Sequence, residues 1–165
     1  MNESSVLKYS DIGPDVIDGL LRRYSISSAW VAAGLTLTGS YWGEPEAGIV
    51  GQHVYLSPAT PVHSLLHEVC HIICMTPERR RTLHGNAGSD DLEESATCYL
   101  QVLLADHLPC VGRQRLMQDM NAWGYSFRAG SIRRWFGDDA EDAQAWLMRE
   151  NLVTAAGKPV FRLRE

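Results

Sequence analysis

The stretch His67-Glu68-Val69-Cys70-His71 lies within a run of apolar residues that predicts a buried helix over Val62–Met75. Because His67 and His71 are four residues apart, their side chains project from one face of that helix, a turn apart. Two imidazoles in this arrangement can bind one metal ion, and neutral imidazole is a common zinc ligand. Glu68 lies roughly 100° around the helix from His67, so it can reach a water on the ion more easily than the ion itself. The stretch therefore predicts a zinc site with Glu68 as general base.

This pattern, His-Glu-x-x-His, is typical of zinc peptidases. In these enzymes the metal lowers the pKa of a water, and the glutamate accepts the water's proton and later protonates the leaving amine. Because short patterns recur by chance, the context matters: the motif follows a β-rich segment and precedes a helix rich in carboxylates. Two histidines and a glutamate among apolar neighbours also need polar partners, which a metal supplies. The sequence thus indicates a peptide-bond hydrolase with Zn²⁺ as its cofactor.

The third zinc ligand is the part of the site that the motif leaves open. One class of zinc peptidases continues the motif with a glycine and a third histidine, but Cys74 and Pro77 occupy those positions here. The remaining candidates are a carboxylate on the next helix, predicted from Asp91 to about His107, and His84 in the segment between the helices. The interval after His71 is long enough to finish one helix, cross a loop and begin the next.

Helical geometry favours Glu94 as that carboxylate. Four polar or small side chains spaced i, i+3, i+4 and i+7 form one face of the predicted helix, namely Glu94, Thr97, Cys98 and Gln101. The opposite side of the helix is apolar and suited to packing. Glu93 is the second choice, since a role in capping the helix explains it equally well. We therefore predict His67, His71 and Glu94 as the ligand set.

The run Asp91–Gln101 (DLEESATCYLQ) resembles the glutamate helix of the gluzincin superfamily of zinc metallopeptidases. Aligning it on Leu92, Tyr99 and Leu100 puts the glutamate ligand of those enzymes at Glu94. The order of a short sheet, a His-Glu-x-x-His helix and a glutamate helix is also similar to that of the minimal ImmA/IrrE-like gluzincins, over about residues 45–105. The resemblance implies a peptidase of narrow range whose protein or peptide substrate adds as a strand along the sheet edge at His53–Leu56.

The remaining sequence predicts one α+β domain over residues 1–165. Glycine-punctuated β-prone runs indicate a small, mostly antiparallel sheet, with strands expected at Ala29–Val31, Leu35–Thr38, Gly48–Val50 and His53–Leu56. Outside the two central helices, we expect helices at Gly13–Tyr24, Arg113–Trp123, Ser131–Phe136 and Ala140–Asn151, and a loop at Pro77–Gly88. Residues 1–110 would then form the sheet and the metal-binding helices, and residues 111–165 a helical C-terminal extension.

Composition excludes several classes of protein. The net charge of -5 argues against nucleic-acid binding through a general electrostatic attraction. There is no apolar run long enough for a membrane span and none resembling a signal sequence at the N-terminus, so we expect a cytoplasmic protein with reduced thiols. The four cysteines have no metal-site or disulfide spacing, and we interpret them as small buried residues: Cys70, Cys74, Cys98 and Cys110.

Two other functions fit parts of the pattern. The His84-Gly85 pair resembles the context of the third histidine in SprT-like, DNA-associated proteases, which would make His84 the third ligand. The other is a non-catalytic, metal-stabilised binding or regulatory module with a metallopeptidase fold. Glu68 distinguishes this module from an enzyme, since a purely structural metal site needs no base. His84 and Tyr125 are further candidates for groups that donate to the transition state.

Overall fold

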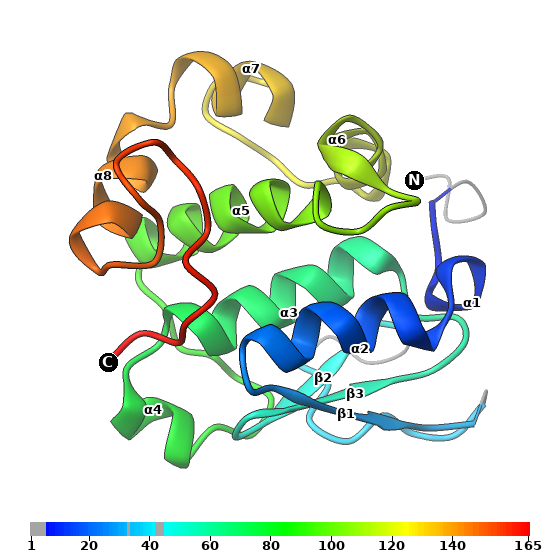
Figure 1. Cartoon of the computed structure of the whole chain (residues 1–165). Coiled ribbons are helices and arrows are strands. Elements are labelled where there is room, and N and C mark those ends of the chain that lie inside the picture. The colour runs from blue at the N-terminus through cyan, green and yellow to red at the C-terminus, as the bar shows by residue number, and fades with distance from the viewer. Residues whose placement is uncertain (1–5, 33, 42–44) are drawn as a thin grey trace.

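The computed structural model of the chain describes residues 6–32, 34–41 and 45–165. Within them the fold is α+β, as predicted, with a small three-stranded sheet and eight helices (Figure 1). No helix of the described residues is both long and apolar enough to cross a membrane. In chain order the elements are α1 (Tyr9–Ile12), α2 (Pro14–Arg23), β1 (Ser27–Trp30), β2 (Gly48–Val50), β3 (His53–Leu56), α3 (Val62–Cys74), α4 (Pro77–Arg81), α5 (Asp91–Ala105), α6 (Gly112–Trp123), α7 (Ile132–Asp138) and α8 (Glu141–Arg149).

The sheet is mixed, so the prediction of a mostly antiparallel sheet was wrong. Its strand order is β1-β3-β2: β3 pairs with β1 in parallel and with β2 in antiparallel orientation. A two-residue hairpin joins β2 to β3, and Gly51 in it has a φ of 59°, which favours glycine. The predicted strand Leu35–Thr38 is absent because the chain turns at both of its ends. Gly34 and Gly39 there have φ angles of 84° and 70°.

The expected substrate edge at His53–Leu56 was also wrong, because β3 is the central strand. The outer edge of β2 is occupied by two loops. Ile49 donates its N–H to the carbonyl of Gly39 at 3.0 Å and accepts from the N–H of Gly85 at 2.8 Å. Neither edge of β3 is therefore open to an added strand.

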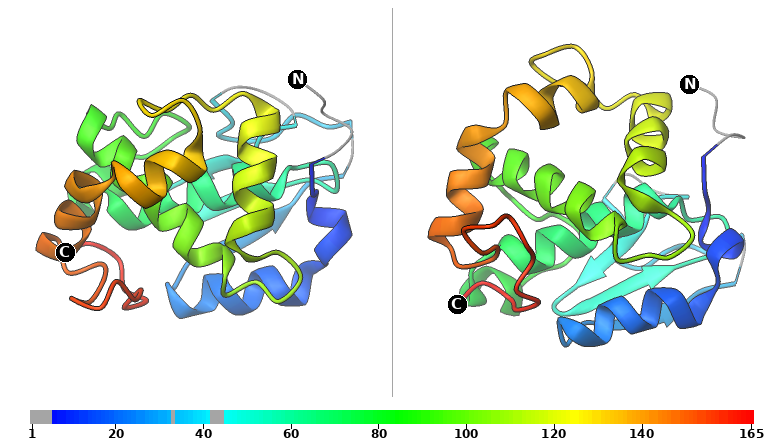
Figure 2. Two further views of the ribbon diagram at one scale, coloured as in Figure 1. Left: turned by 90° about the horizontal axis from the view of Figure 1, so that it is seen from above. Right: turned by 45° about the horizontal axis from the view of Figure 1, so that its top comes forward.

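Helix α3 lies between the sheet and α5 (Figure 1), and the right-hand view of Figure 2 shows the same order. Apolar residues surround α3 on almost every side, so nearly all of it is buried. Helix α5 begins where predicted, with Asp90 accepting a hydrogen bond from the N–H of Glu93 at 2.8 Å. The segment expected to be a loop contains a short helix, α4, whose N-terminus has the favourable pair Thr76-Pro77.

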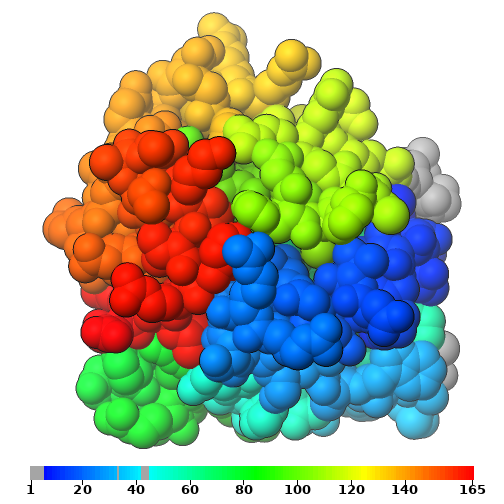
Figure 3. Space-filling model, viewed as in Figure 1, coloured from blue at the N-terminus to red at the C-terminus, as the bar shows by residue number. Residues whose placement is uncertain are grey.

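The C-terminal part of the chain is helical up to Arg149, and residues 150–165 then follow without helix or strand. This last segment packs on the surface of α2 (Figure 3), where the Arg23 guanidinium lies 3.2 Å from the ring centroid of Phe161. It also covers the C-terminal end of α3. The N–H of Arg164 donates to the carbonyl of Ile73 at 2.9 Å, and its guanidinium donates to that of Cys74 at 3.2 Å. The segment thereby satisfies carbonyl groups that a helix end leaves free.

Two glycines are expected to respond to alanine with opposite signs. A Cβ on Gly48 would lie 1.9 Å from the carbonyl oxygen of Thr38, so backbone must shift, whereas Gly19 in α2 has open space around it. We expect Gly48→Ala to lower the free energy of unfolding by about 1–3 kcal/mol. Gly19→Ala should raise it by about 0.5–1 kcal/mol, because alanine loses less backbone entropy in a helix. Urea unfolding of both variants, followed by circular dichroism, tests this; two changes of the same sign would contradict it.

Candidate metal centre

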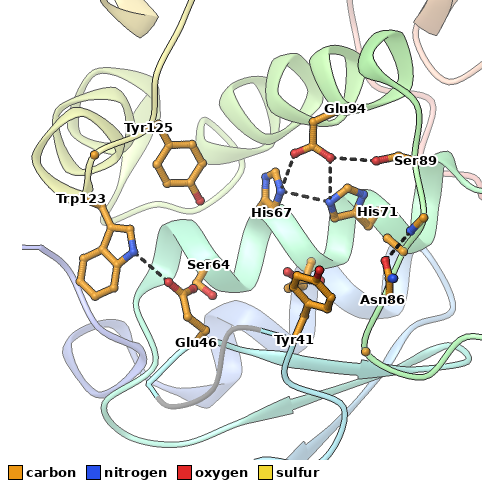
Figure 4. Close-up of a pocket in the computed structure, with 15 residues that line it drawn as sticks. Tyr41, Glu46, Ser64, His67, His71, Asn86, Ser89, Glu94, Trp123 and Tyr125 are labelled. Atoms are coloured by element: carbon orange, nitrogen blue, oxygen red, sulfur yellow. Dashed lines mark hydrogen bonds and ion pairs between the residues drawn. The ribbon is translucent and has the colours of Figure 1, made fainter.

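Helices α3 and α5 bring together the three side chains predicted as ligands (Figure 4). The Nε2 atoms of His67 and His71 are 3.1 Å apart. The Glu94 carboxylate lies across both of them, with Oε1 at 3.0 Å from Nε2 of His67 and Oε2 at 3.2 Å from Nε2 of His71. Ser89 donates to Oε2 of Glu94 at 2.9 Å and so fixes the carboxylate from its other side. The three donors form a small triangle.

This triangle fits a tetrahedral zinc ion. With bonds of about 2.0–2.2 Å, neighbouring ligand atoms around zinc lie roughly 3.3 Å apart, close to the separations between these side chains. Two imidazoles and one carboxylate are also a known ligand set of catalytic zinc. The two Nε2 atoms face each other, an arrangement that two neutral imidazoles with lone pairs there tolerate only with a cation between them or a shared proton.

The pKa values of the three groups are shifted in different directions. Burial lowers the pKa of His67, but Tyr125, Cys98 and Glu94 together raise it well above its usual range. Burial, and secondly the nearby His67, lower the pKa of His71 to about 3. Burial opposes the ionisation of Glu94, yet the two histidines hold the pKa of its carboxyl below the usual range. A metal ion in the triangle would require both imidazoles to offer a lone pair at Nε2.

Glu68 lies beside the triangle and is only 8% exposed. Its carboxylate makes no hydrogen bond or ion pair with any residue that the structure describes. Burial is the main cause that raises the pKa of Glu68 to about 7; Glu46 and Glu94 add to the rise, and His67 opposes it. Glu68 is thus mostly buried, and its carboxylate has no partner among the described residues.

Glu68 and the triangle line one cavity of about 660 Å³. The described residues around it include three glutamates, two tyrosines and a tryptophan, but no lysine or arginine. They are Tyr41, Glu46, Ser64, His67, Glu68, His71, Gly85, Asn86, Ala87, Gly88, Ser89, Glu94, Trp123, Gly124 and Tyr125. The cavity is large enough for a few residues of a peptide.

One wall of the cavity combines residues that sequence reasoning missed. Trp123 at the end of α6 donates its indole N–H to Oε1 of Glu46 at 2.8 Å (Figure 4). Ser64 on α3 accepts from the N–H of Ala47 at 2.9 Å and anchors the segment before β2. Ser64 precedes Glu68 by one helical turn, so helix periodicity had the signal needed to find it. Glu46 and Trp123 are far apart in sequence, and no local pattern links them.

Glu93 and His84, the other candidates for the third ligand, lie outside the triangle. Oε2 of Glu93 accepts from Arg79 at 2.8 Å and lies 3.6 Å from the Arg164 guanidinium, in a buried ion-pair cluster. His84 is exposed, forms a backbone bridge with Val50, and is not among the residues lining the cavity. Of the candidates for a third ligand, only Glu94 lies between the two histidines.

Tyr125, the other predicted helper, does line the cavity. Its hydroxyl lies 3.2 Å from Nδ1 of His63, and its ring meets that of His67 edge to face, with centroids 5.8 Å apart. Burial, and secondly the nearby His67, lower the pKa of His63 to about 3, so this imidazole is neutral. With its hydrogen on Nδ1, a neutral His63 would donate to the Tyr125 oxygen and leave the hydroxyl hydrogen free to be donated elsewhere.

The cysteines follow the prediction in three cases and depart from it in one. Cys70, Cys74 and Cys98 are buried, whereas Cys110 is exposed. Cys98 is the cysteine closest to the centre: its sulfur and ligand atoms of His67 and Glu94 all lie within 4.8 Å of one another. It is on the face of α5 that the sequence predicted to be next to the metal.

Comparisons with protein-family models, with curated proteins and with solved structures yield no match to this chain.

Proposed function

We propose that this chain is a zinc-dependent peptidase. The ligands are His67, His71 and Glu94, and Glu68 is the general base. The observation that best supports this function is the position of a buried, unpaired carboxylate next to a triangle of two imidazoles and one carboxylate. All four side chains line the same cavity.

Different residues of the cavity would have different roles in peptide hydrolysis. Zinc, when bound, would polarise the scissile carbonyl group. It would also lower the pKa of a water, so that the water could lose a proton and attack that carbonyl group. Glu68 accepts a proton from the attacking water and delivers it to the nitrogen of the leaving amine. Tyr125 donates its hydroxyl hydrogen to the oxygen on which negative charge develops. Burial strengthens the basicity of Glu68, because it disfavours the charged carboxylate.

The partnerless state of Glu68 favours an enzyme over a structural metal module. A buried carboxylate without a donor or a cation lowers the stability of the fold. A closed structural site would gain nothing from such a group, whereas a peptidase needs it beside the reacting water. The test is cleavage of a diverse peptide library by zinc-loaded protein, read by mass spectrometry. We expect cleavage that a chelator abolishes and added zinc restores. Full zinc occupancy with no cleavage at all would instead identify a binding module.

Tyr125→Phe tests the assignment of the oxyanion donor. The change removes only the hydroxyl, so we expect kcat to fall by about 10²-fold, as is typical when one such donor is lost. Zinc content and KM should change little, because Tyr125 is not in the ligand triangle. Phenylalanine at Tyr99, whose ring stacks on Phe136 away from the centre, provides the matched control. Equal kcat values for Tyr125→Phe and wild type would remove Tyr125 from the mechanism.

A further inference from the structure

Gln101 on α5 is fully buried beside the centre, and its neighbours fix the orientation of its amide. The side-chain Nε2 lies 2.7 Å from the backbone carbonyl oxygen of His63. A carbonyl oxygen can only accept, so the amide nitrogen must be the end that faces it. The opposite end of the amide, Oε1, therefore faces Nδ1 of His67, at 3.1 Å.

That orientation determines which nitrogen of His67 bears the hydrogen. Oε1 of Gln101 can only accept, so Nδ1 of His67 must donate. A neutral imidazole has a single N–H, and its other nitrogen then has a free lone pair. In His67 this other nitrogen is Nε2, the atom 3.0 Å from Glu94 and 3.1 Å from Nε2 of His71.

We propose that Gln101 is a positioning residue, which holds His67 in the Nδ1–H tautomer and aims the lone pair of Nε2 at the metal. The inference builds on the proposed zinc site. His71 has no equivalent support, since its buried Nδ1 has no hydrogen-bond partner among the described residues. Among the described residues, Gln101 is thus the side chain that accepts from Nδ1 of His67, and Nδ1 of His71 has no counterpart to it.

Gln101 also connects the ligand to the predicted oxyanion donor. Burial raises the pKa of Tyr125, and a hydrogen bond with Gln101 opposes that rise. The same amide thus contacts α3 at two successive turns, at the His63 carbonyl and at the His67 ring, and reaches Tyr125 beyond the end of α6. A rotation of this one side chain would disturb a metal ligand and a transition-state donor together.

Three variants separate positioning from packing. Gln101→Leu keeps the size of the side chain but removes both hydrogen bonds. Gln101→Glu keeps an acceptor, now charged, for Nδ1 of His67. Thr97→Val is the matched control, because Thr97 is equally buried on α5, one turn earlier, and its hydroxyl forms no hydrogen bond with either histidine. Zinc affinity is measured for each by competition with a chelator of known affinity.

We expect Gln101→Leu to weaken zinc binding by about 10–100-fold, the usual effect of losing such a partner. Gln101→Glu should restore most of the affinity, and Thr97→Val should match wild type. Nitrogen-15 NMR of the zinc-loaded protein provides a second readout. Zinc on Nε2 requires Nδ1–H in every variant, so the proton shift of this N–H, assigned by its loss in His67→Ala, should move upfield in Gln101→Leu, which lacks the acceptor, and stay downfield in wild type and Gln101→Glu.

Wild-type affinity in Gln101→Leu, or an Nε2–H signal for His67 in zinc-loaded wild type, would overturn the positioning role. Failure of the wild-type protein to bind zinc would instead overturn the proposed function. Because affinity and tautomer are both measured without a substrate, the two failures are distinguishable.

Discussion

Replacing Glu68 by glutamine is expected to lower kcat/KM for peptide cleavage by about 10²- to 10⁴-fold, the factor that a positioned general base contributes. Glutamine has nearly the same shape but cannot accept the proton of the attacking water. The bound zinc should remain at one ion per chain, because Glu68 is not one of the three donors of the triangle. Peptide kinetics and metal analysis on the same preparations measure both quantities.

Two further variants sharpen this experiment. Glu68→Asp keeps a carboxylate but withdraws it by one methylene, so it should retain part of the activity that glutamine loses. Glu78→Gln provides the matched charge change on the exposed surface of α4, far from the cavity, and should behave as wild type. Loss of zinc in Glu68→Gln would show that this carboxylate is a ligand rather than a base. Undiminished cleavage would show that it has no part in the reaction.

Alanine at two adjacent glutamates is expected to have opposite consequences. Glu94→Ala removes one donor of the triangle and should weaken zinc binding by more than about 100-fold, beyond the loss seen for a partner that only orients a ligand. Glu93→Ala should leave zinc affinity unchanged but lower the free energy of unfolding by about 1–3 kcal/mol, since it removes the charged acceptor of Arg79. Chelator competition and urea unfolding of both proteins separate the two effects.

His84→Ala completes this comparison, because His84 was the other candidate for third ligand. The side chain is exposed and outside the cavity lining, so we expect neither zinc affinity nor stability to change. A large loss of zinc in His84→Ala, with normal binding in Glu94→Ala, would contradict the ligand set and favour the SprT-like alternative.

The face of each helix on which the proposed ligands lie could be predicted, because it depends on local helical geometry. His67 and His71 face the same way through helix periodicity alone, and the same rule selected the face of α5 that contains Glu94. The buried character of α3 followed from its apolar sequence, and the helix limits followed from capping residues and prolines. Each of these inferences uses residues within one or two helical turns of one another.

What could not be predicted depends on contacts between distant parts of the chain. The parallel pairing of β1 with β3 joins strands on either side of a long connection, and alternation of residues has no information on strand order. The hydrogen bond from Trp123 to Glu46 also joins residues that are far apart in sequence, so no local pattern predicts it. Glu93 and Glu94 look alike in sequence, and only the arginines around Glu93 separate their roles. Gln101 was predicted on the same face of α5 as Glu94, but its hydrogen bonds with His67 and with the His63 carbonyl were not predicted.

The contacts of Arg164 with the end of α3 have a consequence for the order of events during synthesis. The carbonyl groups of Ile73 and Cys74 receive their donors from this arginine, and Arg80 donates both to the carbonyl of Ile72 and to that of Arg164 itself. On the ribosome, the helix with the proposed zinc ligands emerges long before Arg164 does. We expect its C-terminal turn to lack these two donors until residue 164 has left the exit tunnel, and zinc loading to follow translation rather than accompany it.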